Sequence, residues 1–154
     1  MGIEIERKFL VKDDSWKAEA SEGLVCKQGY LASDRGTTVR IRVMGEKAFL
    51  TIKGATHGVS RPEYEYEIPV PDAEGMLRLC THAPVEKTRY LIEHAGMTWE
   101  LDVFAGRNAG LVMAEIELEA EEQSFERPPW AGDEVSRDGR YYNSYLAAKP
   151  YASW

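Results

Sequence analysis

The chain has 154 residues, which suits one domain with a hydrophobic core of its own. Hydrophobic residues make up 44% and charged residues 29% of the sequence, proportions that are ordinary for a soluble globular protein. Lys and Arg number 19 against 26 Asp and Glu, so the formal net charge is −7. This acidic balance argues against a nucleic-acid-binding protein, which needs a basic face. It still allows a local basic cluster that binds a small anion.

Two cysteines, Cys26 and Cys80, are too few for a disulfide scaffold, and no Cys/His spacing indicates zinc. We therefore expect free thiols in a reducing cytoplasm. The N-terminus has no basic segment followed by an apolar run, and no stretch approaches the roughly 18 apolar residues of a membrane span. The sequence contains no repeat or linker, so we expect a single domain over residues 1–154, without membrane or nucleic-acid partners.

Short segments in which polar and apolar residues alternate recur along the chain, separated by turn signals. Such alternation is typical of half-buried strands. The expected strands span residues 2–11, 25–32, 38–43, 48–53, 61–68, 84–94, 98–104 and 111–119. Short helices are expected over residues 16–20, 72–80 and 120–125 and from residue 143. We predict a mainly β (α+β) fold, an eight-stranded antiparallel β-barrel with a few flanking helices.

Charged residues of like sign share one face of most of these strands. The acidic sets are Glu4/Glu6, Glu63/Glu65/Glu67, Glu100/Asp102 and Glu115/Glu117/Glu119, and the basic sets are Lys8, Arg40/Arg42, Lys53 and Lys87/Arg89. These side chains either face solvent around an apolar core or face inward and line a polar tunnel. An inward lining is costly unless cations and a polyanion satisfy it. The apolar residues on the opposite strand faces favour the tunnel, since helices outside a barrel could cover them, but periodicity alone leaves both open.

One N-terminal stretch places two carboxylates and an ammonium on a single strand face, in Glu4-Ile5-Glu6-Arg7-Lys8. That combination suits a divalent cation beside an anionic ligand. Together with Arg40-x-Arg42, Lys53, Glu86-Lys87-Thr88-Arg89-Tyr90, Glu100-Leu101-Asp102 and Glu115-Ile116-Glu117, the stretch resembles the CYTH superfamily, also called triphosphate tunnel metalloenzymes. The resemblance covers essentially the whole chain in the family's order. It implies a barrel whose charged residues line a central tunnel.

Within that family, the length, the Gln28-Gly29-Tyr30-Leu31 block and the 86–90 block are most similar to short bacterial inorganic triphosphatases, which hydrolyse tripolyphosphate. The likeness implies that Mg²⁺ or Mn²⁺ is held by Glu4, Glu6, Glu115 and Glu117. It implies that the triphosphate is gripped by Lys8, Arg40, Arg42, Lys53, Lys87 and Arg89. It also implies a catalytic pair, Lys87 and Tyr30, and further tunnel carboxylates at Glu63, Glu65 and Asp102.

The chemistry agrees with these roles. Phosphoanhydride hydrolysis requires neutralised phosphate charge and a water placed in line. Guanidiniums bind phosphate oxygens bidentately, lysines act as point charges, and a metal can activate water. Whether Lys87 acts as a base or only as a substrate ligand is left open.

Several functions remain open at this point. The same family includes class IV adenylate cyclases and thiamine triphosphatases, and a non-catalytic polyphosphate- or nucleotide-binding module is a further alternative. A structural barrel without a ligand is the remaining one. The sequence does not distinguish among triphosphate substrates or longer polyphosphate, nor does it identify the metal. A homodimer through an exposed strand or helix face is also open.

Overall fold

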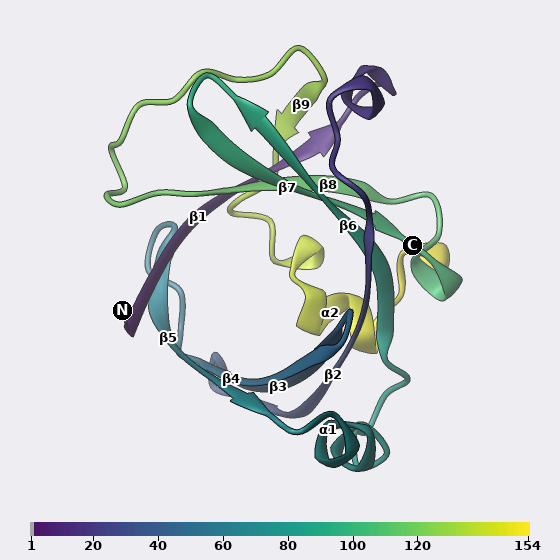
Figure 1. The fold of residues 1–154 in the computed structure, drawn as a ribbon. Helices are drawn as coiled ribbons and strands as arrows, with labels where there is room; N and C mark the ends of the chain where they lie inside the picture. Colours follow the sequence, from purple (N-terminus) through teal and green to yellow (C-terminus); the bar gives the residue numbers. More distant parts are fainter. Residues whose placement is uncertain (1) are drawn as a thin grey trace.

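The computed structural model describes residues 2–154. Its strands are β1 Gly2–Val11, β2 Leu24–Asp34, β3 Thr37–Met44, β4 Lys47–Lys53, β5 Ser60–Ile68, β6 Val85–His94, β7 Met97–Phe104, β8 Val112–Glu117 and β9 Ala131–Glu134. Across these residues they form one antiparallel sheet in the order β5-β4-β3-β2-β6-β7-β8-β1-β9. Pairing of β5 with β1 closes β1 to β8 into a ring, and β9 is added to β1 (Figure 1). The predicted eight-stranded antiparallel barrel is confirmed, whereas β9 was not predicted.

Strand β1 is the element on which the ring closes. Its first residues, from Gly2 to Ile5, pair with β5, whereas those from Glu6 to Leu10 pair with β8. The far end of β1 also pairs with β9. The side chains of Glu4, Glu6 and Lys8 therefore project from the strand that joins β5 to β8.

The helices are short and differ from prediction in several places. They are α1 Val70–Leu77 and α2 Asn143–Ala148, with 3-10 turns η1 Ser15–Ala18, η2 Gly106–Asn108, η3 Gly139–Tyr141 and η4 Tyr151–Ser153. The predicted boundaries 72–80 were wrong, since Pro69 is the N-cap and a second proline follows in the first turn, where it needs no N–H partner. The helix predicted over 120–125 was also wrong, since that segment forms a turn. No helix within residues 2–154 is long and apolar enough to cross a membrane.

Two apolar clusters lie on the outer face of the ring. In one, Ile41 and Ala48 pack against Ala73 and Leu77 of α1. In the other, Trp99 is fully buried among other aromatic rings. The prediction that helices cover the outer apolar faces is confirmed for α1. The second cluster is covered instead by η1, β9 and the irregular segment before β9.

A third apolar cluster lies inside the ring. Val85, Phe104 and Met113 stand on the same strand faces as the inward charged residues of β6, β7 and β8. They pack against Leu146 and Ala147 of α2, which lies within the outline of the ring (Figure 1). Helix α2 therefore forms an apolar floor, and the charged part of the interior lies above it.

Candidate functional site

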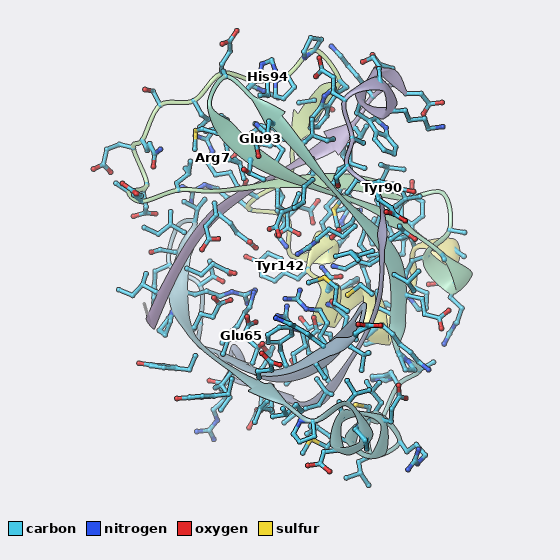
Figure 2. All side chains as sticks on the ribbon, viewed as in Figure 1. Arg7, Glu65, Tyr90, Glu93, His94 and Tyr142 are labelled. Carbon is cyan, nitrogen blue, oxygen red and sulfur yellow. The ribbon has the colours of Figure 1, made fainter. Side chains whose placement is uncertain are left out.

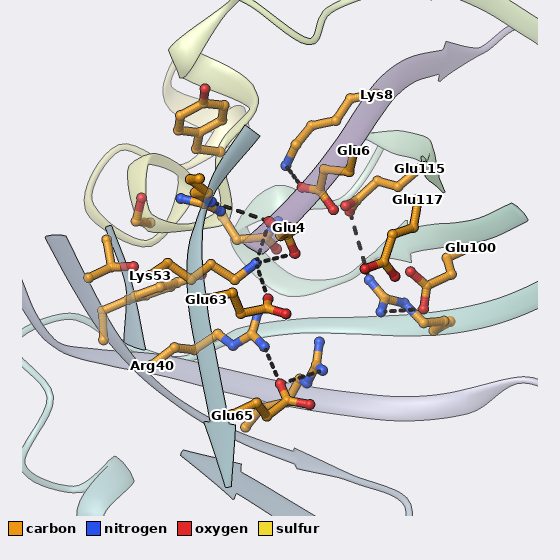
Figure 3. Close-up of a pocket in the computed structure, with 18 of the residues that line it drawn as sticks. Glu4, Glu6, Lys8, Arg40, Lys53, Glu63, Glu65, Glu100, Glu115 and Glu117 are labelled. Atoms are coloured by element: carbon orange, nitrogen blue, oxygen red, sulfur yellow. Dashed lines mark hydrogen bonds and ion pairs between the residues drawn. The ribbon is translucent and has the colours of Figure 1, made fainter. Parts of the chain in front are cut away.

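The inward faces of the ring enclose a cavity of about 190 Å³ lined mainly by charged side chains (Figure 3). Within residues 2–154 its lining includes seven carboxylates, Glu4, Glu6, Glu63, Glu65, Glu100, Glu115 and Glu117. It also includes seven cations, Lys8, Arg40, Arg42, Lys53, Arg61, Lys87 and Arg89. Tyr30 and Tyr142 also line the cavity, and Tyr142 lies in the ring's interior (Figure 2). The tunnel interpretation is confirmed, and the alternative in which these charges face solvent was wrong.

The strand register brings charges from different strands opposite one another. On β1 and β8, Glu6 faces Glu117 and Lys8 faces Glu115. On β6 and β7, Arg89 faces Asp102. Residues directly opposite each other in an antiparallel pair share a face and interact, so each row of like charges meets a neighbouring row. The period-two pattern of the sequence thus becomes a network of facing charges.

Glu4 is held by two cations on one side of the cavity. Lys53 Nζ lies 2.9 Å from Glu4 Oε2 and 3.3 Å from Glu63 Oε2. Arg61 Nε donates to Glu4 Oε1 at 3.3 Å. Burial acts to raise the pKa of Glu4, but Lys53, the hydrogen bond with Glu63 and Arg61 outweigh it and bring the pKa to about 2. Glu4 is therefore an ionised carboxylate bound to ammonium and guanidinium.

Glu6 and Glu115 form a second, crowded carboxylate pair. Burial and the charge of Glu115 raise the pKa of Glu6 to about 8. Burial also acts to raise the pKa of Glu115, but Lys8 and a hydrogen bond from Glu6 lower it well below its ordinary value. Lys8 Nζ lies 3.5 Å from Glu6 Oε1. Near neutral pH the proton of this pair resides on Glu6, where a divalent cation could replace it.

The fit of a metal ion can be judged from this donor set. Glu4, Glu6, Glu115 and Glu117 offer only carboxylate oxygens, the ligands that Mg²⁺ and Mn²⁺ accept. Burial and neighbouring carboxylates also raise the pKa of Glu117, an environment that a divalent cation would relieve. Within residues 2–154 no three such side chains converge on one point as positioned. The residue types fit a metal, and as positioned Glu4, Glu6 and Glu115 lie beside cations.

Arg40 and Arg42 present unused donors in the opposite wall. Arg40 Nη2 lies 3.3 Å from Glu65 Oε2, and Arg42 Nη2 lies 3.7 Å from the same oxygen. The Nε atoms of both arginines are buried and lack a hydrogen-bond partner within residues 2–154. Buried donors are rarely left unpaired, and guanidiniums match phosphate oxygens well. The chemistry of this wall therefore suits an anion such as phosphate.

Lys87 and Arg89 share one carboxylate near the floor. Lys87 Nζ lies 2.8 Å from Asp102 Oδ2 and donates to Asn143 Oδ1 at 3.1 Å. Arg89 donates to both oxygens of Asp102, at 2.8 and 2.9 Å. Burial acts to raise the pKa of Asp102, but Lys87 and Arg89 outweigh it and lower the pKa. Asp102 stays ionised and fixes both cations in place.

Six lining residues had no assigned role in the sequence analysis, namely Thr38, Arg61, Glu100, Tyr142, Asn143 and Ser144. Arg61 shares a strand face with Glu63 and Glu65, so the same period-two signal marks it. Glu100 was recognised within an acidic set, and Arg89 Nη1 donates to it at 3.0 Å. Tyr142 and Asn143 lie at the start of α2, outside the stretches of alternating polar and apolar residues that predict strands. Nothing in the local sequence could have placed these two in the tunnel.

Comparison with known proteins identifies the family. The family model described as the CYTH domain matches residues 2–146. The chain belongs to the CYTH family. It is 48% identical to a protein named inorganic triphosphatase from Acetivibrio thermocellus, covering 100% of this chain and 99% of that protein. It is 40% identical to one of the same name from Nitrosomonas europaea, covering 94% and 96%.

Solved structures of other proteins share the fold. A crystal structure of an inorganic triphosphatase matches with a TM-score of 0.66 at 39% identity, covering 94% of this chain and 93% of that one. A Hippeastrum protein described as a putative adenylyl cyclase with dominant triphosphatase activity matches with a TM-score of 0.60, covering 79% and 81%. Its identity is 15%, so it supports the fold alone. Membership of a family of tunnel metalloenzymes implies a metal dependence.

Proposed function

We propose that this chain hydrolyses inorganic tripolyphosphate in a metal-dependent reaction inside the charged tunnel. The observation that carries the proposal is the lining itself, in which equal numbers of carboxylates and cations meet around one cavity within residues 2–154. The names of the relatives at 48% and 40% identity support the same reaction. We propose that residues 1–154 act as one domain, since α2 near the C-terminus packs inside the ring.

In this proposal the metal is Mg²⁺ or Mn²⁺, held by Glu4, Glu6, Glu115 and Glu117. When bound, such an ion neutralises phosphate charge and lowers the pKa of a coordinated water. The carboxylates reach this role from two strands, β1 and β8, that pair directly with each other. Their common position supports one shared metal-binding region at the ring's closure.

The triphosphate would be gripped by Lys8, Arg40, Arg42, Lys53, Lys87 and Arg89, with Arg61 as an additional cation. Most of these cations hold a carboxylate in the structure, as Lys53 holds Glu4 and Arg40 holds Glu65. Phosphate oxygens would take over the cations and release carboxylates toward the metal. The lining holds seven carboxylates and seven cations, so a metal ion or a triphosphate bound alone would add charge that the other ligand compensates. We call this rearrangement, in which the cations pass from carboxylates to phosphates and the carboxylates pass to the metal, partner exchange. It requires that bound metal increases the affinity for triphosphate and that bound triphosphate increases the affinity for metal.

Lys87 and Tyr30 are the proposed catalytic pair. Lys87 is buried and held by Asp102 and Asn143, which suits an ammonium that stabilises charge on the transferring phosphoryl group. A base role for Lys87 remains a hypothesis and requires it to leave Asp102. Tyr30 lies in the wall beside the apolar floor. Glu63, Glu65 and Asp102 act in this scheme as counter-ions that position the cations.

Phosphate release from a substrate panel tests the function. The panel compares tripolyphosphate, ATP, thiamine triphosphate and pyrophosphate, each with Mg²⁺, Mn²⁺ or chelator, and follows cyclic AMP in the ATP samples. We expect strong metal-dependent turnover of tripolyphosphate above the others. Cyclic AMP or thiamine diphosphate as the main product would contradict the substrate assignment. Tripolyphosphate binding without turnover of any substrate would contradict the enzymatic function.

A cytoplasmic location and a homodimer are secondary proposals. Cys26 and Cys80 are free thiols, which suits a reducing compartment. The outer face of β4 and β5 exposes Ile52, Tyr64 and Tyr66, and exposed tyrosines are common in interfaces. Size-exclusion chromatography with light scattering tests the dimer, and a mass of 17.4 kDa in solution would contradict it.

A further inference from the structure

A buried glutamine lies in the tunnel wall beside the proposed catalytic tyrosine. Gln28 is 0% exposed and stands on β2 opposite Arg42 of β3 and Val85 of β6. Its side chain therefore faces the interior, on the same strand face as Cys26 and Tyr30. A buried amide is costly unless both of its ends find partners. The partners that Gln28 finds are Cys26 and Tyr30.

The two contacts fix the orientation of the amide. Cys26 Sγ donates to Gln28 Oε1 at 3.5 Å, an ordinary distance for a sulfur donor. Gln28 Nε2 donates to Tyr30 Oη at 3.1 Å. Cys26 is itself 0% exposed, so water does not compete for its thiol hydrogen. The thiol thus directs the amide oxygen toward itself and the amide N–H₂ toward the tyrosine.

This orientation determines what Tyr30 can do. Because the phenol oxygen already accepts a hydrogen bond from Gln28, the hydroxyl hydrogen is free to point elsewhere. The ring is packed against the apolar floor on one side and lines the charged cavity on the other. The register of β2 against β3 shifts between Tyr30 and Ala32, and such bulges redirect side chains near functional sites. The remaining direction for the hydroxyl hydrogen is the cavity.

We propose that Gln28 is a positioning residue that, fixed by Cys26, turns the Tyr30 hydroxyl hydrogen toward a phosphate oxygen of the bound triphosphate. This rests on the proposed function. Tyr30 then acts as a neutral hydrogen-bond donor, aimed before the substrate arrives. Preorganised donors of this kind stabilise charge that develops during reaction. Gln28 itself does not touch the substrate.

A double-mutant cycle tests this role. Gln28→Met keeps the length of the side chain and removes the donor, and Tyr30→Phe removes the hydroxyl. We expect Gln28→Met to lower kcat for tripolyphosphate about tenfold, with KM changed less than about twofold, as for a lost positioned donor. In the Tyr30→Phe background, Gln28→Met should lower kcat no further. An unchanged kcat in Gln28→Met, or an equal loss in both backgrounds, would overturn the proposal.

The chain's other glutamine provides a matched control. Gln123 is half-buried in the segment before β9, outside the tunnel lining. Gln123→Met should leave kcat and KM unchanged. If Gln28→Met does not fold, Cys26→Ala replaces it, since loss of the thiol frees the amide to rotate. We expect a smaller fall in kcat that again vanishes in Tyr30→Phe, and a fall that persists there would count against Gln28.

An activity-independent measurement separates this proposal from the proposed function. In ¹⁵N-labelled protein the side-chain amide signals of Gln28 should shift and exchange faster with solvent in Tyr30→Phe. The same signals should be unaffected by Gln123→Met. Unchanged Gln28 signals in Tyr30→Phe would overturn the hydrogen bond even in an active enzyme. If the Gln28 signals shift in Tyr30→Phe but the wild-type protein does not hydrolyse tripolyphosphate, the proposed function is contradicted and the Gln28–Tyr30 hydrogen bond is supported.

Discussion

Metal binding should release a proton from Glu6. The pKa of this carboxyl is about 8 because of burial and the neighbouring charge of Glu115. At pH 7 only about one-tenth of Glu6 is then ionised in the metal-free tunnel, and a metal ion must displace the proton. The apparent association constant should therefore rise about tenfold per pH unit below pH 8 and level off above it. A titration of Mn²⁺ alone by calorimetry, at pH 6 to 9, measures this slope.

Calorimetry in buffers of different ionisation enthalpy counts the released protons directly. We expect about one proton per metal at pH 6.5 and almost none at pH 9. Glu6→Gln should abolish the pH dependence and weaken binding, because the ligand no longer ionises. An affinity that stays constant from pH 6 to 8, with no proton release in wild type, would refute the reasoning.

The same proton affects stability. A carboxyl whose pKa rises on folding contributes stability below its ordinary pKa of 4.5, and this contribution is lost as the pH rises through about 8. In chelator the contribution of Glu6 to Tm should therefore decline between pH 5 and 8, and Glu6→Gln should flatten that decline. Glu4 does not contribute to this decline in Tm. Because its pKa is about 2, its own stabilising contribution is lost only at acid pH. A wild-type slope equal to that of Glu6→Gln would contradict this assignment.

Four further substitutions have distinct expected results. Lys87→Ala should lower kcat at saturating tripolyphosphate about a hundredfold or more, and full turnover would exclude a catalytic role. Arg40→Ala should raise KM about tenfold with a smaller change in kcat, measured by phosphate release, because a phosphate-binding cation is lost. Trp99→Ala should lower the free energy of unfolding in urea by about 3–5 kcal/mol, since the ring is fully buried. Arg7→Ala should cost less than about 1 kcal/mol in the same assay, because its ion pair with Glu134 is partly exposed.

The strands were predictable because their signal is local. Alternation of side chains at period two follows from backbone geometry, and β1 begins and ends where the alternation of residues 2–11 begins and ends. Which face of each strand points into the ring was not predictable in this way, since inward-facing and outward-facing charges give the same alternation in the sequence. The structure resolves it with α1, which covers Ile41 and Ala48 on the outside. The resemblance to the CYTH superfamily had also implied that the charged residues face inward.

The elements that were missed depend on distant contacts. Strand β9 has four residues and pairs with β1 from the far end of the chain, Glu134 opposite Phe9. The segment 120–125 was predicted as a helix, but Phe125 packs its ring against Phe9 and Trp99, and this packing outweighs local helix propensity. The place of Asn143 beside Lys87 likewise exists only because α2 folds into the ring.

The central claim is that carboxylates and cations in the tunnel exchange partners for metal and triphosphate. Calorimetric titration of tripolyphosphate, into protein with chelator and into protein with saturating Mg²⁺, tests it most directly. Partner exchange predicts an association constant at least about tenfold larger with the metal, a coupling of about 1.4 kcal/mol or more. The Lys53→Ala variant, which lacks one of the two cations that hold Glu4, should show a smaller coupling. Equal affinities with and without metal in the wild-type protein would contradict the claim.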